Sequence, residues 1–240
     1  MYFGSNMTTV DIILPAYNPL PGWEDMVVNR FLSLENQLPE LQFKLIVVND
    51  GSSKINQTES VEKLNTNIIS LQWISYAVNK GKGYALRKGV DASTSDYIIY
   101  TDIDWPYKEA SMIGLINNLL SSADAVVGIR DDSYYDQLPP SRRRLSKLLK
   151  KFNAGFLRLK VDDTQAGLKG FRKNVKETFL ATTIDRYLFD LEFIYLLSRE
   201  SHFIVKGYPI VLRPGISFSK MKSRILLHEA GNFLKIWLGV

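Results

Sequence analysis

Two aspartates stand one residue apart in the stretch YIIYTDIDWP, residues 97–106. They are Asp102 and Asp104, and an apolar run precedes them. On an extended segment, side chains two residues apart point to the same side, so both carboxylates can meet one cation. Without a cation, two such charges at the end of a buried strand repel each other. The pair therefore predicts a divalent metal site. The alternative is that one carboxylate caps a helix beginning near Tyr107 while the other is solvated.

The composition limits which metal such a site could hold. The chain has 240 residues, no cysteine and two histidines, His202 and His228. This composition excludes disulfides, a thiolate zinc site and a cysteine nucleophile, and it disfavours a histidine-based site. Carboxylate oxygens suit Mg²⁺ or Mn²⁺, which are the expected cofactors. The net charge of +5 indicates an anionic partner.

A polar loop, VVNDGSS at residues 47–53, ends a second apolar run. Asp, Gly and Ser are typical of a turn that caps a following helix. The same residues also suit a loop that lies along a nucleotide, with Asp50 accepting hydrogen bonds from a base edge. Both interpretations stay open from the residues alone.

The segment NKGKGYALRKG, residues 79–89, places two glycines with Lys80 and Lys82 at the start of a predicted helix. Amide groups and lysines at such a position favour phosphate. The alternative is a flexible loop with solvated lysines. The segment lacks the Gly-Lys-Ser/Thr spacing of a P-loop, and no predicted strand runs into G-x-G-x-x-G.

These loops need a scaffold that brings them together. Short apolar runs alternate with segments of helical periodicity, which predicts an α/β fold with a mostly parallel, Rossmann-like sheet flanked by helices. In such sheets ligands bind at the carboxyl ends of the strands, and here every such end is polar. The expected strands are residues 10–17, 43–50, 67–78, 96–104 and 123–130, and the expected helices are residues 23–37, 84–90, 110–122 and 189–197. After residue 140 helices are expected to dominate and to hold a second ligand.

Six segments occur in the order ILPAYN, VVNDGSS, NKGKGYALRKG, YTDIDWP, DTQAGLKGF and FDLEF. Together they resemble the family 2 inverting glycosyltransferases of GT-A fold, and most closely the branch that makes dolichyl- or polyprenyl-phosphate sugars. The resemblance covers residues 8–235. It implies a single domain over residues 7–240, with a nucleotide-sugar-binding half at 7–105 and a helix-rich acceptor-binding half at 106–240. Residues 1–6 are interpreted as a cloning remnant.

The resemblance also implies a role for each matching residue. On the donor side these are Pro15, Tyr17 and Asn18 beside the base and ribose, Asp50 on the base with Gly51 and Ser52 nearby, Lys82 near the nucleotide, Asp102 near the ribose or metal, and Asp104 as the principal metal ligand. On the acceptor side they are Asp163, Thr164, Gln165 and Lys169. Asp190 matches the position of the catalytic base, and Asp163 and Gln165 join it as candidate catalytic residues. For Asp190 and Glu192 the alternative is capping of a helix start.

The implied reaction is an inverting, metal-dependent transfer of a sugar from a nucleotide-sugar, expected to be a UDP-sugar, to a polyprenyl or dolichyl phosphate. A phosphate acceptor is already anionic, so Asp190 would orient it while Lys169 and Arg130 steady its charge. A sugar hydroxyl acceptor would need Asp190 as a base. Two alternatives stay open: transfer to a saccharide in cell-surface polysaccharide synthesis, and a non-catalytic module that binds nucleotide-sugar or lipid.

Residues 142–160 carry eight basic residues and no acidic one, with leucine and phenylalanine at helical spacing. Such a helix can lie in a lipid interface, or dock on the protein with a solvated basic face. We see no signal peptide and no apolar stretch of the roughly 20 residues that span a bilayer. The expected location is therefore cytoplasmic, peripheral on the membrane if that helix binds lipid. Nucleic acid is not an expected partner, because stacking aromatics are not interleaved with the basic residues.

Overall fold

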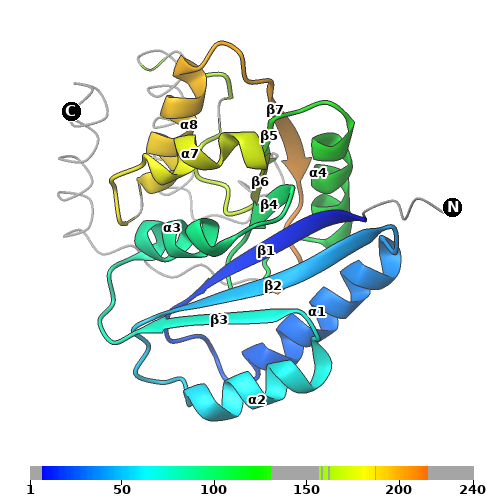
Figure 1. Ribbon diagram of the computed structural model, residues 1–240, viewed down its shortest axis with the longest axis vertical. Coiled ribbons are helices and arrows are strands. Elements are labelled where there is room, and N and C mark those ends of the chain that lie inside the picture. Colours follow the sequence, from blue (N-terminus) through cyan, green and yellow to red (C-terminus); the bar gives the residue numbers. More distant parts are fainter. Residues whose placement is uncertain (1–6, 131–156, 158, 162, 187, 216–240) are drawn as a thin grey trace, which may run out of the picture.

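The computed structural model describes residues 7–130, 157, 159–161, 163–186 and 188–215. Within these residues one sheet of seven strands runs through the molecule in the order β3-β2-β1-β4-β6-β5-β7 (Figure 1). The strands are β1 (Thr8–Ala16), β2 (Leu41–Asp50), β3 (Leu71–Tyr76), β4 (Tyr97–Tyr100), β5 (Ala125–Arg130), β6 (Lys169–Arg172) and β7 (Val205–Ile210). β6 pairs antiparallel with both β4 and β5, whereas the other pairings are parallel.

Helices cover both faces of the sheet (Figure 1). They are α1 (Trp23–Gln37), α2 (Gln57–Asn67), α3 (Lys82–Ala92), α4 (Glu109–Ser121), α7 (Lys176–Leu180) and α8 (Phe189–Arg199), with a 3₁₀ turn, η1 (Lys173–Val175). Apolar side chains of α1, α2 and α4 share one buried cluster, and those of α3, α7 and α8 share another. The sheet therefore has one hydrophobic layer on each face.

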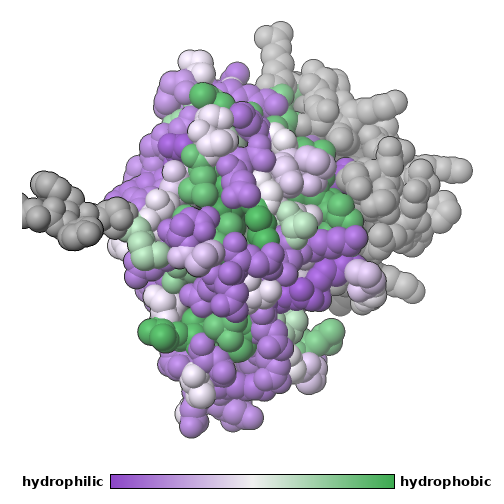
Figure 2. Space-filling model, turned by 90° about the vertical axis from the view of Figure 1, so that its right-hand side faces the viewer, coloured by the Kyte–Doolittle hydropathy of each residue, from purple (hydrophilic) through white to green (hydrophobic). Residues whose placement is uncertain are grey.

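The long apolar runs of the sequence follow from this double cover. In β1, Ile12 and Leu14 belong to the cluster under α1, whereas Ile13 between them belongs to the cluster under α3. Successive strand residues point to opposite faces, and both faces are buried, so no alternation with polar residues is needed. On the face drawn in Figure 2, hydrophilic residues dominate and hydrophobic ones form a few narrow patches.

The expected fold class is confirmed: a mixed α/β domain with a mostly parallel central sheet. Two strands, β6 and β7, were not predicted and come from the half where helices were expected to dominate. β6 is only four residues long, and β7 contains Gly207 and Pro209. Pro209 lacks an N–H group and is tolerated because β7 is the last strand in the sheet order.

The expected helix at residues 142–160 lies almost entirely outside the described residues, and so do residues 1–6. Among the residues that the structure describes, no helix has both the length and the apolar character needed to cross a bilayer.

Candidate active site

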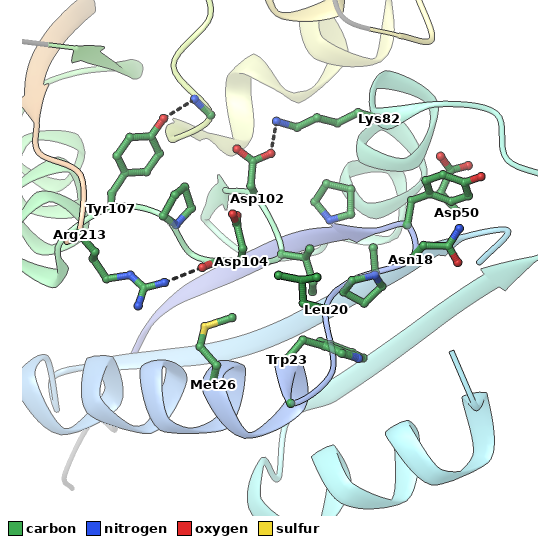
Figure 3. Close-up of a pocket in the computed structure, with 18 of the residues that line it drawn as sticks. Asn18, Leu20, Trp23, Met26, Asp50, Lys82, Asp102, Asp104, Tyr107 and Arg213 are labelled. Carbon is green, nitrogen blue, oxygen red and sulfur yellow. Dashed lines mark hydrogen bonds and ion pairs between the residues drawn. The ribbon is translucent and has the colours of Figure 1, made fainter. Parts of the chain in front are cut away.

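A cleft of about 920 Å³ lies at the carboxyl ends of β1, β2 and β4. It is lined by eight of the predicted site residues: Pro15, Tyr17, Asn18, Asp50, Lys82, Asp102, Asp104 and Gln165. Asp50 and Asn18 lie at one end of the cleft, Tyr107 and Arg213 lie at the other, and the two aspartates lie between them (Figure 3). Gly51, Ser52, Asp163 and Asp190 are not among the lining residues.

The direction of β6 explains how Gln165 reaches the cleft. Because β6 is antiparallel to β4, the segment that precedes β6 arrives at the edge where the parallel strands end. Gly167 lies in this segment, and its N–H donates to the Tyr107 hydroxyl over 2.9 Å. A Cβ atom at Gly167 would overlap the Asp102 carboxylate, so the carboxylate can keep this position only beside a glycine.

The acidic pair lies on a turn, not on an extended strand. β4 ends at Tyr100, and the Trp105 N–H donates to the Asp102 carbonyl over 2.9 Å. The argument from strand spacing was therefore wrong, although both carboxylates do line the cleft. Neither caps a helix, since α4 begins at Glu109 after Lys108 and has no side-chain cap.

Trp105 has a φ of 45°, a strained value for a bulky residue. Its indole is buried, and Arg213 binds the turn from the segment after β7. The Arg213 Nε donates to the Trp105 carbonyl and an Arg213 terminal nitrogen donates to the Asp104 carbonyl, each over 2.7 Å. Strain of this kind persists only where neighbours hold it, and here Arg213 does so.

The carboxylates of Asp102 and Asp104 interact electrostatically with each other and with the Lys82 ammonium. Burial, and then the charge of Asp102, raise the pKa of Asp104. The Lys82 ammonium lies 2.5 Å from Asp102 Oδ1. Burial lowers the pKa of Lys82, but the carboxylates of Asp102 and Asp190 outweigh it and the pKa is raised. Lys82 therefore stays protonated and neutralises part of the acidic charge.

Asp102 and Asp104 fit a Mg²⁺ or Mn²⁺ ion that takes its remaining oxygens from water and from a bound phosphate. Mg²⁺ is usually held in this way, by one or two carboxylates plus substrate phosphates. Within the described part of the chain, no group of three His, Cys, Asp or Glu side chains could hold a metal. Asp102 and Asp104 are thus the residues that would hold such an ion.

Asp50 is buried and organises the loop after β3. Its carboxylate accepts hydrogen bonds from the Lys80 N–H (2.7 Å), the Gly81 N–H (2.9 Å) and the Asn79 amide (2.7 Å). Gly51 has a φ of 65°, and a Cβ atom there would overlap the Asn79 nitrogen. The loop after β2 and the loop after β3 are therefore packed backbone to backbone at the cleft.

The start of α3 does not offer the predicted phosphate cradle of amides. The N–H groups of Gly83 and Tyr84 donate to the Asp185 carbonyl, in addition to the two amides taken by Asp50. The Lys80 ammonium lies over the Tyr84 ring, 4.4 Å from its centre. Of Lys80 and Lys82, Lys82 is the one that lines the cleft.

Asn18 joins the loops that follow β1 and β2. Its side-chain oxygen accepts from the N–H groups of Ser53 and Lys54, and its own N–H donates to the Ser52 hydroxyl, all over 3.0 Å. Ser52 in turn donates to the Ala16 carbonyl over 3.3 Å. These bonds fix the rim of the cleft on which Tyr17 is exposed.

Asp190 stands at the start of α8, in a buried cluster. Its Oδ1 accepts from the Tyr100 hydroxyl (2.7 Å) and from the Lys169 ammonium (2.6 Å). Lys169 is 1% exposed and also donates to the Ala166 carbonyl. Burial lowers the pKa of Lys169 although Asp190 opposes the shift. Lys169 thus joins Asp190 to the segment that precedes β6. Its burial there argues against the expectation that it steadies an acceptor's charge.

The remaining acidic candidates also have partners. Asp163 is buried and accepts three hydrogen bonds from Arg130, at 2.8–2.9 Å, and one from the Gln165 N–H. Burial opposes ionisation of Asp163, but the bonds and charge of Arg130 outweigh it and the pKa is lowered. Glu192 accepts from the N–H groups of Thr183 and Ile184, so it caps the turn before α8.

Comparison with known proteins identifies the chain. The family description "Glycosyl transferase family 2" matches residues 11–179, which span the cleft loops, the acidic pair and β6. The protein is a family 2 glycosyltransferase. The predicted family and enzyme class are therefore confirmed.

Several curated relatives of this glycosyltransferase share about a quarter of its residues. A dolichyl-phosphate beta-glucosyltransferase of Dictyostelium discoideum is 28% identical over 210 residues, 79% of this chain and 62% of the relative. The human protein of the same name is 25% identical over 205 residues, 78% and 62% of the two chains. Glycosyltransferase AglD of Haloferax volcanii is 26% identical over 232 residues, 95% and 37%. This chain thus spans less than two thirds of the length of these relatives.

Solved structures confirm the GT-A fold. Glucosyl-3-phosphoglycerate synthase of Mycobacterium tuberculosis, in complex with Mn²⁺, UDP and glucosyl-3-phosphoglycerate, has a TM-score of 0.55 at 16% identity, over 97% of this chain and 79% of that one. Mannosyltransferase PcManGT of Pyrobaculum calidifontis, with GDP-Man and Mn²⁺, has a TM-score of 0.54 at 16% identity, over 83% and 54%. At these identities the likeness concerns the fold alone.

Some residues of the glycosyltransferase cleft were not predicted. Arg186, Tyr107, Gly167 and Arg213 all line it. Of these, Gly167 lies inside the motif DTQAGLKGF and could have been considered from the sequence. A glycine in a motif often marks a position where another group lies close to the backbone. Arg213 follows β7, which carried no strand signal, so nothing in the sequence placed it beside Asp104.

Proposed function

We propose that this glycosyltransferase transfers a sugar from a UDP-sugar to a polyprenyl phosphate, with Mg²⁺ or Mn²⁺ held by Asp102 and Asp104. The observation that carries the proposal is the acidic pair in the middle of a cleft of about 920 Å³, a volume suited to a small-molecule substrate. When bound, the cation would neutralise the donor's diphosphate and make it a better leaving group.

The cleft's residues suggest how the donor lies. The base and ribose would occupy the end formed by Asn18, Tyr17 and Asp50, where paired loops make a rigid rim (Figure 3). The diphosphate would lie at Asp102 and Asp104, within reach of the Lys82 ammonium. The sugar would then face Tyr107 and Gln165, beside the segment that precedes β6.

The acceptor class is supported by the relatives named dolichyl-phosphate beta-glucosyltransferase. A phosphate acceptor is anionic near neutral pH and needs no deprotonation. This chemistry agrees with the surroundings of Asp190, which is 5% exposed and bound to Tyr100 and Lys169. We therefore assign Asp190 an orienting role: through Lys169 it holds the segment that precedes β6 in place beside the cleft.

A donor panel tests the proposal. UDP-glucose, other UDP-sugars and GDP-mannose are supplied with a short polyprenyl phosphate, with and without Mn²⁺, and released nucleoside diphosphate is measured. We expect release from a UDP-sugar only with the cation, and a loss of about a hundredfold or more in Asp104→Asn. Asp91→Asn is the control, because Asp91 is an exposed residue on α3. Ion-independent release, unchanged in Asp104→Asn, would refute the proposal.

The acceptor assignment needs its own experiment. Asp190→Asn is assayed with a polyprenyl phosphate and with a saccharide acceptor, and its melting temperature is measured to detect loss of packing around Lys169. Turnover on the lipid phosphate within about tenfold of the parent supports an orienting role, since a lost general base typically costs 10²-fold or more. A folded variant with that larger loss contradicts the orienting role, and a parent that uses only the saccharide contradicts the phosphate-acceptor assignment.

A further inference from the structure

The Asp102 carboxylate is held from two sides. The Lys82 ammonium lies 2.5 Å from Oδ1, and the other oxygen lies against Gly167, where even a methyl group would overlap it. Neither side chain of the ion pair is fully buried, since Lys82 is 30% and Asp102 is 38% exposed. In Figure 3 the Lys82 chain reaches across the cleft to this carboxylate, next to Asp104.

A cation that bridges Asp102 and Asp104 must approach the same carboxylate oxygens. An ammonium at hydrogen-bond distance from Oδ1 repels that cation and takes an oxygen it would use. On the Gly167 side little room is left at Oδ2, because a Cβ atom on Gly167 would overlap it. Lys82 and a divalent cation therefore compete for Asp102.

The Lys82 ammonium can move away from Asp102 without a change in the backbone. The backbone of Lys82 is fixed at the first position of α3, where the next two N–H groups donate to the Asp185 carbonyl. Its ammonium, by contrast, sits at the end of a flexible four-carbon stem. In the described structure the ammonium has Asp102 as its hydrogen-bonded partner, and a diphosphate in the cleft would be a second anion of higher charge.

We propose that Lys82 acts as a tethered counter-ion that occupies the metal position beside Asp102 in the free protein and moves to the donor's phosphates when the donor binds. The inference rests on the proposed function, because it takes the acidic pair to be the metal site. Its consequence is ordered binding: the cation binds weakly alone and tightly with the nucleotide. By linkage, the nucleotide must then raise metal affinity by the factor by which metal raises nucleotide affinity.

Metal binding without turnover tests this inference. Mn²⁺ affinity is measured by electron paramagnetic resonance of the free ion, with and without UDP, for the parent and for Lys82→Gln. Without UDP we expect Lys82→Gln to bind Mn²⁺ about fivefold more tightly, which corresponds to a partly exposed ion pair. With UDP we expect a smaller gain in Mn²⁺ affinity than in the parent, because the ammonium that met the phosphates is gone.

Two further variants control the measurement. Lys80→Gln removes the same charge two residues earlier, in the loop before α3. The Lys80 ammonium lies at Tyr84, so the Mn²⁺ affinity of this variant without UDP should match the parent. Lys82→Arg keeps a cation on the same residue and should retain weak binding without UDP. If Lys82→Gln does not fold, a parent-like Lys82→Arg still supports the inference, and a tighter Lys82→Arg overturns it.

The outcomes separate the inference from the proposed function. Equal Mn²⁺ affinity in the parent and in Lys82→Gln, with weaker binding in Asp102→Asn, overturns the counter-ion role and leaves the metal site intact. Absence of Mn²⁺ binding in every variant, with and without UDP, overturns the proposed metal-dependent function itself.

Discussion

At the scale of single residues, the cleft region is built from ion pairs that join distant segments. Asp102 meets Lys82, Asp190 meets Lys169, and Asp163 meets Arg130. The Asp190–Lys169 and Asp163–Arg130 pairs are buried, and buried charges persist only when paired, so these two aspartates also have a structural role. Substitutions must therefore be followed by stability as well as by activity.

Asp163→Asn should destabilise the protein by about 3 kcal/mol at pH 7, because it leaves the Arg130 guanidinium without its buried carboxylate partner. The pKa of Asp163 is below its ordinary value of 3.8 in the folded state. A lowered carboxyl pKa stabilises the folded state fully above 3.8, and this stabilisation is lost as the pH falls through the folded pKa. The difference between parent and variant, measured by urea unfolding, should thus be smaller at pH 3 than at pH 7.

Asp25→Asn serves as the control for this pair, because Asp25 forms an exposed ion pair with Lys63. It should change stability little at either pH. A difference between parent and Asp163→Asn that is independent of pH would show that shape, not charge, sets the effect.

Gly167→Ala should disturb the metal site more than the fold. The added methyl group overlaps the Asp102 carboxylate, which must shift, and a shift of about 1 Å in a reacting group can cost 10²-fold in rate. We expect transfer to fall about a hundredfold with weaker Mn²⁺ binding. Gly170→Ala, in β6, adds the same methyl group against Leu115 and Ile99 and should lower stability while Mn²⁺ affinity is kept. Unchanged Mn²⁺ affinity in both variants would contradict the assigned contact.

At the scale of elements, the antiparallel strand β6 and the edge strand β7 complete the cleft. β6 delivers Gln165 and Gly167 to the acidic pair, and the segment after β7 delivers Arg213 to the turn that carries Asp104. The parallel strands alone would leave the cleft without these three residues.

The Arg213 contact predicts a positioning effect. Arg213→Gln removes two bonds to the carbonyls of Asp104 and Trp105, so the strained turn should relax and Asp104 should leave its place. Outer-shell support of this kind is worth about tenfold to a hundredfold in metal affinity or activity. The measurement is Mn²⁺ affinity in the presence of UDP, alongside transfer rate.

Arg172→Gln is the matched control for Arg213. Arg172 also donates to backbone carbonyls, those of Ala123, Leu119 and Leu120, but at the far end of α4. It should lower the melting temperature without changing Mn²⁺ affinity. If both arginine variants weaken Mn²⁺ binding equally, the turn is not specifically held by Arg213.

These elements also show how far sequence reasoning reached. Long apolar runs predicted the five parallel strands β1 to β5, and eight of the residues predicted for the site line the cleft. The four-residue β6 and the Gly- and Pro-containing β7 have too weak a pattern to be recognised. Contacts that depend on these strands, such as Arg213 with Asp104 and Lys169 with Asp190, could not be predicted. The sequence alone does not distinguish a buried, paired lysine or arginine from a solvent-exposed one.

At the scale of the whole molecule, the division into a donor half at 7–105 and an acceptor half at 106–240 is not a division of the core. Both hydrophobic clusters contain residues from each side of residue 105. One contains Val47 with Leu168, and the other contains Ile13 with Phe179. β4 and β6 are also paired directly across the boundary. A sheet continuous through both halves should unfold as one cooperative unit.

This prediction can be tested with a chain whose fluorescence reports on one half. Trp237→Phe leaves Trp23, Trp73 and Trp105, all within residues 7–105, as the tryptophans, while circular dichroism reports on the whole chain. The two urea transitions should coincide. Adding Phe179→Ala, which empties space in the cluster of Phe171 and Phe193, should shift both midpoints together by the equivalent of about 3–5 kcal/mol. A fluorescence transition that stays in place while the circular dichroism transition moves would mean that the donor half folds on its own.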